Sequence, residues 1–208
     1  MAKETTKLMI AYFITYILGG IPSRIILNDK IKKFLYIKIP FIVDNKNYTV
    51  NFNEVILDSL KAVLVVWILP KLFVLLLETP FKFCLYPYLN FNVLKIGLLI
   101  SAYLGHVLIV YLCGWGKKGS ALLIVGSLFL VPQTIVYLLV SSLIFAIITR
   151  SARITSWLTC LMIPLCIWYY DSETYVFIIG TGILACINTL AFLYDLKIIK
   201  KYDFENKK

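Results

Sequence analysis

Long apolar blocks separated by short polar stretches dominate the chain. They span residues 7–27, 55–77, 91–113, 120–149, 154–170 and 175–194. Most of these blocks are close to the ~20 residues that an α-helix needs to cross the hydrocarbon core of a bilayer. The chain is 61% hydrophobic, which exceeds the roughly 45–50% typical of soluble domains. The pattern predicts an all-α polytopic membrane protein, with residues 1–208 forming a single integral membrane domain.

The block at 120–149 is too long for one straight membrane helix, and Pro132 lies near its middle. Proline removes a backbone hydrogen bond and clashes with the preceding turn of a helix. We therefore predict two short helices joined at residues 131–133, which brings the total to about seven transmembrane helices. The first block lacks the small-residue cleavage site of a secretory signal peptide, so we expect it to be the first of the seven.

Lysine and arginine residues orient the predicted bundle, because cytoplasmic loops collect them. With seven helices, one side of the membrane holds 15 of these residues and the other side holds 4. The basic side includes the 28–53 loop, residues 117–118, Arg150 with Arg153, and the charged tail after residue 194. The N-terminus is therefore predicted outside and the C-terminus in the cytoplasm. We expect the protein to lie in a cell inner (plasma) membrane.

Residues that commonly bind metals are few and scattered along the chain. The five cysteines lie mostly inside apolar blocks, and Cys160 and Cys166 have no histidine or carboxylate near them in sequence. We interpret them as small lipid-facing or core residues, without a disulfide framework. We expect no metal, no cofactor and no nucleic-acid partner.

The segment GHVLIVYLCGWGKKGSA, residues 105–121, ends in two lysines flanked by glycines. Lys117 and Lys118 fit two interpretations. They are typical of ordinary cytoplasmic anchors, and they also fit an anion-binding loop. In the second interpretation Gly116 and Gly119 let backbone N–H groups approach a phosphate beside the ammonium groups. The helix predicted to start at Ser120 would add the positive end of its dipole.

The same segment resembles the second signature of the bacterial acyl-phosphate:glycerol-3-phosphate acyltransferase family, roughly G-H-x-x-P-V-F-L-x-F-x-G-G-K-G-V-A-T. The positions that match it without a gap are Gly105, His106, Val110, Leu112, Gly116, Lys118, Gly119 and Ala121. AYFITYILGGIP at residues 11–22 and LDSLKAVL at residues 57–64 resemble two further family segments in order and spacing. The resemblance implies seven helices with an active site on the cytoplasmic face.

The resemblance also implies a reaction. Members of the family move a fatty acyl group from acyl phosphate to the 1-hydroxyl of glycerol 3-phosphate, which makes lysophosphatidate in phospholipid biosynthesis. The expected partners are therefore acyl phosphate, glycerol 3-phosphate or a related anionic acceptor, and membrane lipids. Both substrates and the released phosphate are anions, so positioning and charge stabilisation by a basic pocket would supply much of the catalysis.

The candidate phosphate ligands are basic residues and flanking glycines on the predicted cytoplasmic side: Gly116, Lys117, Lys118, Gly119, Lys61 and Arg153. Lys61 lies three residues after Asp58, so the two side chains share a helix face and fit a structural ion pair equally well. Arg153 also fits a cytoplasmic anchor. The sequence does not identify a catalytic residue.

His106 is the only histidine in the chain. It lies about three helical turns before the lysine pair, which places it well inside the bilayer. That depth favours a buried histidine bonded to a neighbouring helix over a general base. We interpret His106, together with Gly105 and Asp58, as a supporting residue.

Two other family signatures are rewritten in this chain. Residues 28–54 read NDKIKKFLYIKIPFIVDNKNYTVNFNE where the family has a stretch close to S-G-N-x-G-A-T-N-x-x-R. The tail reads YDLKIIKKYDFENKK in place of a sequence near H-R-x-N-I-x-R-L-L-x-G-x-E. These departures support an alternative hypothesis, a catalytically inactive or repurposed relative that keeps the helical scaffold and an anion- or lipid-binding site. A third hypothesis is an unrelated small transporter, and the gapless second signature argues against it.

Overall fold

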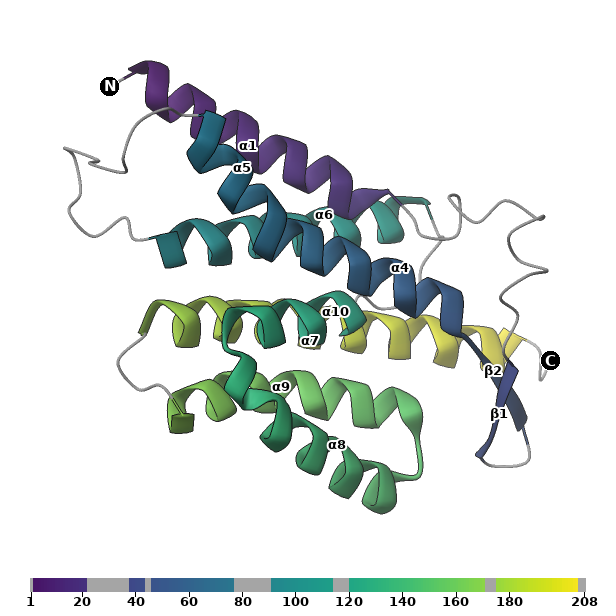
Figure 1. Cartoon of the computed structure of the whole chain (residues 1–208). Coiled ribbons are helices and arrows are strands. Elements are labelled where there is room, and N and C mark those ends of the chain that lie inside the picture. The colour runs from purple at the N-terminus through teal and green to yellow at the C-terminus, as the bar shows by residue number, and fades with distance from the viewer. Residues whose placement is uncertain are drawn as a thin grey trace.

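The computed structural model describes residues 2–21, 38–43, 46–76, 91–113, 120–170 and 175–205. These residues form a bundle of helices with a small β-hairpin (Figure 1). The helical elements are α1 (Ala2–Gly20), α4 (Phe52–Val63), the π-helix η1 (Leu64–Ile68), α5 (Leu69–Leu76), α6 (Phe91–Cys113), α7 (Ser120–Leu130), the 3-10 helix η2 (Pro132–Thr134), α8 (Ile135–Thr149), α9 (Ala152–Tyr170) and α10 (Tyr175–Glu205). The strands are β1 (Lys38–Val43) and β2 (Lys46–Asn51).

Successive helical rods run in opposite directions along the bundle (Figure 1). α4, η1 and α5 follow one another directly and form a single rod. The N-terminus and the C-terminus lie at opposite ends of the molecule (Figure 1). We call these the amino end, where α6 and α10 begin, and the carboxyl end, where α1 and α6 finish and α4 begins.

The predicted break at Pro132 is confirmed. α7 ends at Leu130, and Val131 leaves the helical conformation with φ −136° and ψ 87°. The Thr134 hydroxyl donates to the Val131 carbonyl oxygen at 2.7 Å and closes the turn before α8. The apolar block at 120–149 therefore forms two helices joined by a turn, as its single internal proline suggested.

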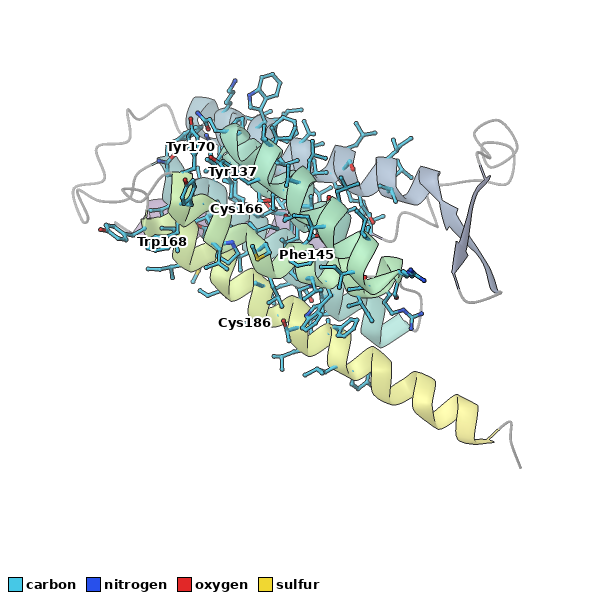
Figure 2. The ribbon with its side chains drawn as sticks, turned by 90° about the horizontal axis from the view of Figure 1, so that it is seen from below. Tyr137, Phe145, Cys166, Trp168, Tyr170 and Cys186 are labelled. Carbon is cyan, nitrogen blue, oxygen red and sulfur yellow. The ribbon has the colours of Figure 1, made fainter. Side chains whose placement is uncertain are left out.

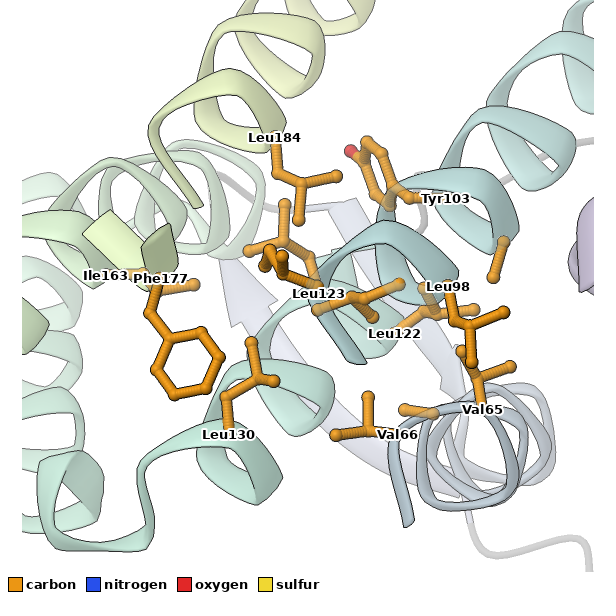
Figure 3. Packing of buried hydrophobic residues seen from close by; sticks show 14 of the residues in the cluster. Val65, Val66, Leu98, Tyr103, Leu122, Leu123, Leu130, Ile163, Phe177 and Leu184 are labelled. Carbon is orange, nitrogen blue, oxygen red and sulfur yellow. The ribbon is translucent and has the colours of Figure 1, made fainter. Parts of the chain in front are cut away.

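α6 lies in the middle of the bundle and packs against α1, η1, α7 and α10 (Figures 1 and 3). Large aliphatic side chains fill the space between these helices. Four of them are completely buried (Figure 3): Leu98 of α6, Leu122 of α7, Leu184 of α10 and Val65 of η1. This packing fixes α6 among η1, α7 and α10.

The outer surface of the bundle is also apolar. On α8, Leu143, Ile147 and Ile148 are 65%, 68% and 71% exposed. A continuous apolar surface of this kind marks contact with a membrane or a partner. In the part of the chain that the structure describes, three segments are long and apolar enough to cross a membrane, Phe91–Leu108, Pro132–Thr149 and Tyr175–Tyr194. The fold is thus that of a helical, membrane-type protein.

Exposed aromatic side chains gather at the amino end of the bundle. Figure 2 shows Tyr137, Trp168 and Tyr170 together at this end, and Tyr137 meets the ring of Tyr169 edge to face, with ring centroids 5.4 Å apart. Trp168, Tyr169 and Tyr170 are all at least half exposed. Tyrosine and tryptophan are enriched where a membrane meets water, so this belt supports a membrane boundary at the amino end.

Two features correct the sequence-based expectations. The loop between the first two predicted helices contains an antiparallel hairpin, with Lys38 opposite Asn51 and Val43 opposite Lys46, which adds one small β element to the helical bundle. The hairpin is rich in isoleucine, valine, tyrosine and threonine, which favour strands. In addition, α10 continues to Glu205 through most of the stretch expected to be a tail. Residues 195–205 contain neither proline nor glycine to end the helix.

Candidate functional site

Three segments that resemble the acyltransferase family meet where α1 ends. Gly19 and Ile21 come from the first segment, Asp58 and Lys61 from the second, and Gly105 from the third. α1 runs along α6, and both helices finish at the carboxyl end of the bundle (Figure 1). The candidate site is therefore built where α1, α4 and α6 come together.

α1 and α6 approach so closely that only small residues fit between their backbones. A Cβ atom on Gly105 would lie 1.9 Å from the backbone oxygen of Tyr16, and one on Gly19 would lie 2.0 Å from that of Ala102. Ser101, four residues before Gly105, donates its hydroxyl hydrogen to a backbone oxygen of α1 at 2.6 Å. Small residues spaced four apart bring membrane helices into backbone contact. The end of α1 is thereby held in place by α6.

Lys61 connects α4 to the end of α1. Its ammonium nitrogen lies 3.5 Å from Asp58 Oδ1 and also donates to the backbone oxygen of Ile21. The Ile21 N–H bonds the Ile17 oxygen, so Ile21 continues the last turn of α1. A cation at this position interacts favourably with the negative end of the helix dipole.

The Asp58–Lys61 ion pair left open by the sequence is therefore present. Asp58 is buried, with 8% of its surface exposed, and Lys61 supplies it with a partner that a buried carboxylate requires. The same ammonium fixes the end of α1. Lys61 acts in this structure as a structural link, and any contact between Lys61 and a phosphate would be made in addition to that link.

We expect Lys61→Met to lower the free energy of unfolding by about 3 kcal/mol, because it leaves the Asp58 carboxylate buried without its cation. Equilibrium unfolding in mixed micelles measures this value. The double variant Lys61→Met, Asp58→Asn should recover most of the loss. The control is Ser59→Ala, since that hydroxyl bonds Val55 O within α4. Equal stability of Lys61→Met and the wild type would contradict the structural link.

His106 follows Gly105 on α6 and is 4% exposed. It lies seven residues before the end of α6 at Cys113, which corresponds to about 10 Å along the helix axis. The burial expected from the sequence is thus confirmed, and it places the imidazole beneath the carboxyl end rather than at its surface. A supporting role for His106 remains our interpretation.

The phosphate loop predicted at Gly116, Lys117, Lys118 and Gly119 lies outside the described residues. The helices on either side of it are described. α6 finishes at Cys113 and α7 begins at Ser120, and both of these points lie toward the carboxyl end of the bundle (Figure 1). The flanking helices therefore lead to the same end as Lys61 and Ile21.

Arg153 is exposed in the first turn of α9. The preceding turn from α8 is held by Arg150, whose φ of 49° is left-handed, and by hydroxyl contact between Thr149 and Thr155 at 2.9 Å. This turn also lies at the carboxyl end, but on the opposite side of α7 and α10 from α1 (Figure 1). The structure thus places Arg153 at the same end as the Asp58–Lys61 pair without bringing it into the group around α1.

One buried polar pair was not singled out from the sequence. The hydroxyl of Tyr103 on α6 donates to Asn188 Oδ1 on α10 at 2.8 Å, and both side chains are almost completely buried. Polar side chains that bond across helices are a common means of fixing membrane bundles. The isolated asparagine in the apolar block 175–194 was the signal that could have indicated this contact.

A family model described as glycerol-3-phosphate acyltransferase matches residues 47–200. The matched range runs from β2 into α10 and includes Asp58, Lys61, Gly105, His106 and Arg153, whereas α1 precedes it. Neither a curated protein nor a solved structure matches the chain significantly. Because the family model covers well over half of the 208 residues, the chain belongs to the glycerol-3-phosphate acyltransferase family.

Proposed function

We propose that this protein transfers a fatty acyl group from acyl phosphate to the 1-hydroxyl of glycerol 3-phosphate and forms lysophosphatidate. The observation that carries the proposal is the meeting of Asp58, Lys61 and Gly105 at the end of α1. Asp58, Lys61 and Gly105 lie within the part of the chain matched by the family model. The meeting of these residues supports the carboxyl end of the bundle as the place where the anionic substrates would bind.

In the proposed step, the 1-hydroxyl oxygen of glycerol 3-phosphate attacks the carbonyl carbon of the acyl phosphate. A new carbon–oxygen ester bond forms, and the bond between the acyl carbon and the phosphate oxygen breaks. The phosphate leaves with the electron pair of that bond, and the hydroxyl proton passes to phosphate or water. Negative charge develops on the carbonyl oxygen and the leaving phosphate, so fixed cations and N–H groups accelerate the step.

The proposed ligands of the two phosphates are on the segments that lead to the carboxyl end. Lys118 is the principal ligand, supported by Lys117 and by the backbone N–H groups of Gly116 and Gly119. Arg153, exposed at the same end, is a further candidate. Lys61 holds the end of α1 in place through its bond to the Ile21 oxygen, and we propose it as a supporting cation for the substrate phosphates.

We further propose that seven helical segments are embedded in an inner (plasma) membrane, with the carboxyl end of the bundle in the cytoplasm. The alternating directions of the rods and the opposite positions of the two termini support this arrangement (Figure 1). The excess of lysine and arginine in the segments at the carboxyl end supports the same orientation. Glycerol 3-phosphate would then reach the site from the cytoplasm.

The second candidate is a relative that keeps the scaffold and binds an anion or lipid without catalysing acyl transfer. Two observations favour it. The first and third family signatures are absent from the sequence, and the charged tail continues α10 as a helix. Under this alternative the loop at 116–119 still binds phosphate, but no lysophosphatidate is formed.

The choice of donor tests the proposed reaction. Purified protein in lipid is given labelled glycerol 3-phosphate with either palmitoyl phosphate or palmitoyl coenzyme A. We expect labelled lysophosphatidate from palmitoyl phosphate and little from the thioester. Product from the thioester alone would contradict the proposed donor, and no product from either would favour the inactive relative.

A further inference from the structure

Two lysines lie close together at the amino end of the bundle, far from the candidate acyl-transfer site. Lys71 is on α5 and Lys95 is in the second turn of α6. α5 and α6 pack against each other there (Figure 1). Because these two helices pack against each other, Lys71 and Lys95 lie at the same end of the bundle on neighbouring helices. The fold therefore brings two like charges together from separate helices.

Each of these lysines lies over an aromatic ring of its own helix. Lys71 Nζ is 4.2 Å from the centre of the Trp67 ring, and Lys95 Nζ is 4.7 Å from the centre of the Phe91 ring. An ammonium group over an aromatic face is attracted by the ring. These contacts hold both side chains at defined positions, and Trp67, which is 53% exposed, is of the type found at the membrane–water boundary.

Two neighbouring cations repel each other unless an anion lies near them. Asp58 is the only acidic residue among the side chains that the structure describes. It lies 13 residues before Lys71 on the same helical rod, which corresponds to about 20 Å along the axis. In addition, α6 begins at Phe91, so the positive end of its dipole adds to the charge of the two lysines. The amino end of α5 and α6 thus favours a bound anion.

The surface next to the two lysines is apolar and faces outward. Leu72, Ile68 and Leu64 follow the same rod toward the carboxyl end and are 47%, 43% and 37% exposed. An inorganic anion would gain nothing from contact with this apolar surface. The acyl chains of a phospholipid would pack along it. Charge at the membrane boundary above an exposed apolar strip is the arrangement that suits a lipid.

We propose that Lys71 and Lys95, with Trp67 and Phe91, form a binding site for the headgroup phosphate of an anionic phospholipid. The lipid belongs to the leaflet that meets the amino end of the bundle, and its chains lie along Leu72, Ile68 and Leu64. This site is separate from the phosphate ligands proposed for acyl transfer, which lie toward the carboxyl end. It does not depend on whether the protein is catalytically active.

Native mass spectrometry of the full-length protein tests this site. The protein is titrated in neutral detergent with dioctanoyl phosphatidylglycerol, dioctanoyl phosphatidylcholine or inorganic phosphate. The variants are Lys71→Gln, Lys95→Gln together, and Lys71→Arg, Lys95→Arg together as the charge-preserving control. We expect the affinity of this site for phosphatidylglycerol to be about 30-fold weaker in the Gln pair, or about fivefold for each charge removed. At lipid concentrations that fill the site in the wild type, the Gln pair should therefore carry one phosphatidylglycerol fewer.

The Arg pair should keep the phosphatidylglycerol that the Gln pair loses, which would also show that the fold tolerates substitution at both positions. Phosphatidylcholine should bind this site more weakly, because its headgroup carries no net charge. Equal phosphatidylglycerol binding by the wild type and the Gln pair would overturn the proposal. It would also be overturned if the two lysines bound inorganic phosphate as tightly as the lipid.

Discussion

Gly105→Ala is expected to lower the free energy of unfolding by about 3 kcal/mol, near the upper end of the usual cost of overpacking. The added Cβ would lie 1.9 Å from the backbone oxygen of Tyr16. Backbone atoms cannot move aside as a flexible side chain can, so α1 must separate from α6. Because α1 carries Ile21, the contact between Lys61 and the Ile21 oxygen should weaken as well.

Gly182→Ala is the matched control for this prediction. Gly182 is also within a helix, α10, and a Cβ atom at this position would have no neighbour within 4 Å. We expect a small gain of about 0.5–1 kcal/mol, because alanine loses less backbone entropy in a helix than glycine does. Equilibrium unfolding in mixed micelles measures both variants. A loss of stability of similar size at both positions would contradict the close packing of α1 on α6.

Lys118→Ala is expected to reduce acyl transfer by about 100-fold or more, the range found when one donor to a developing negative charge is removed. The initial rate of lysophosphatidate formation from palmitoyl phosphate measures this loss. Lys118→Arg keeps the charge with a different geometry, so we expect it to retain part of the activity.

The control for Lys118→Ala is Lys201→Ala, which removes the same charge from the C-terminal part of α10. The two substitutions change the net charge and the predicted cytoplasmic excess of lysine equally. Only the first should slow the reaction. Unchanged activity in Lys118→Ala would exclude the loop at 116–119 as the main phosphate ligand.

Hydrophobic patterning predicted the helical bundle because most apolar blocks are close to the length of a helix that could cross a membrane. The block at 91–113 corresponds to α6, and the single proline in the block at 120–149 marks the turn between α7 and α8. The pattern does not show where a helix ends once it leaves the apolar region. α10 accordingly extends to Glu205, since nothing in the polar sequence interrupts it.

The β-hairpin was not predicted from the sequence either. Residues 38–51 lie within the 28–53 loop, which was interpreted only as a basic cytoplasmic loop. A two-stranded hairpin is marginally stable alone, so a short run of strand-forming residues does not by itself predict one.

In the candidate site, the sequence predicted only the contact that follows from spacing along one helix, the Asp58–Lys61 pair. Asp58 and Lys61 are three positions apart, which is enough to place them on one helix face. The bond from Lys61 to the Ile21 oxygen joins residues 40 positions apart, and it depends on how α1 packs on α6. The resemblance marked Gly105 as a family position, but the structure supplies the physical reason, which is contact with the backbone of α1.

The most direct test of the central claim is a time course of both products from palmitoyl phosphate and glycerol 3-phosphate, with the wild-type protein in lipid. We predict one inorganic phosphate released for each lysophosphatidate formed, and release of neither without glycerol 3-phosphate. Phosphate release that does not require the acceptor would indicate hydrolysis of the acyl phosphate. No products, at protein concentrations where an active member of the family turns over readily, would contradict the proposed acyl transfer.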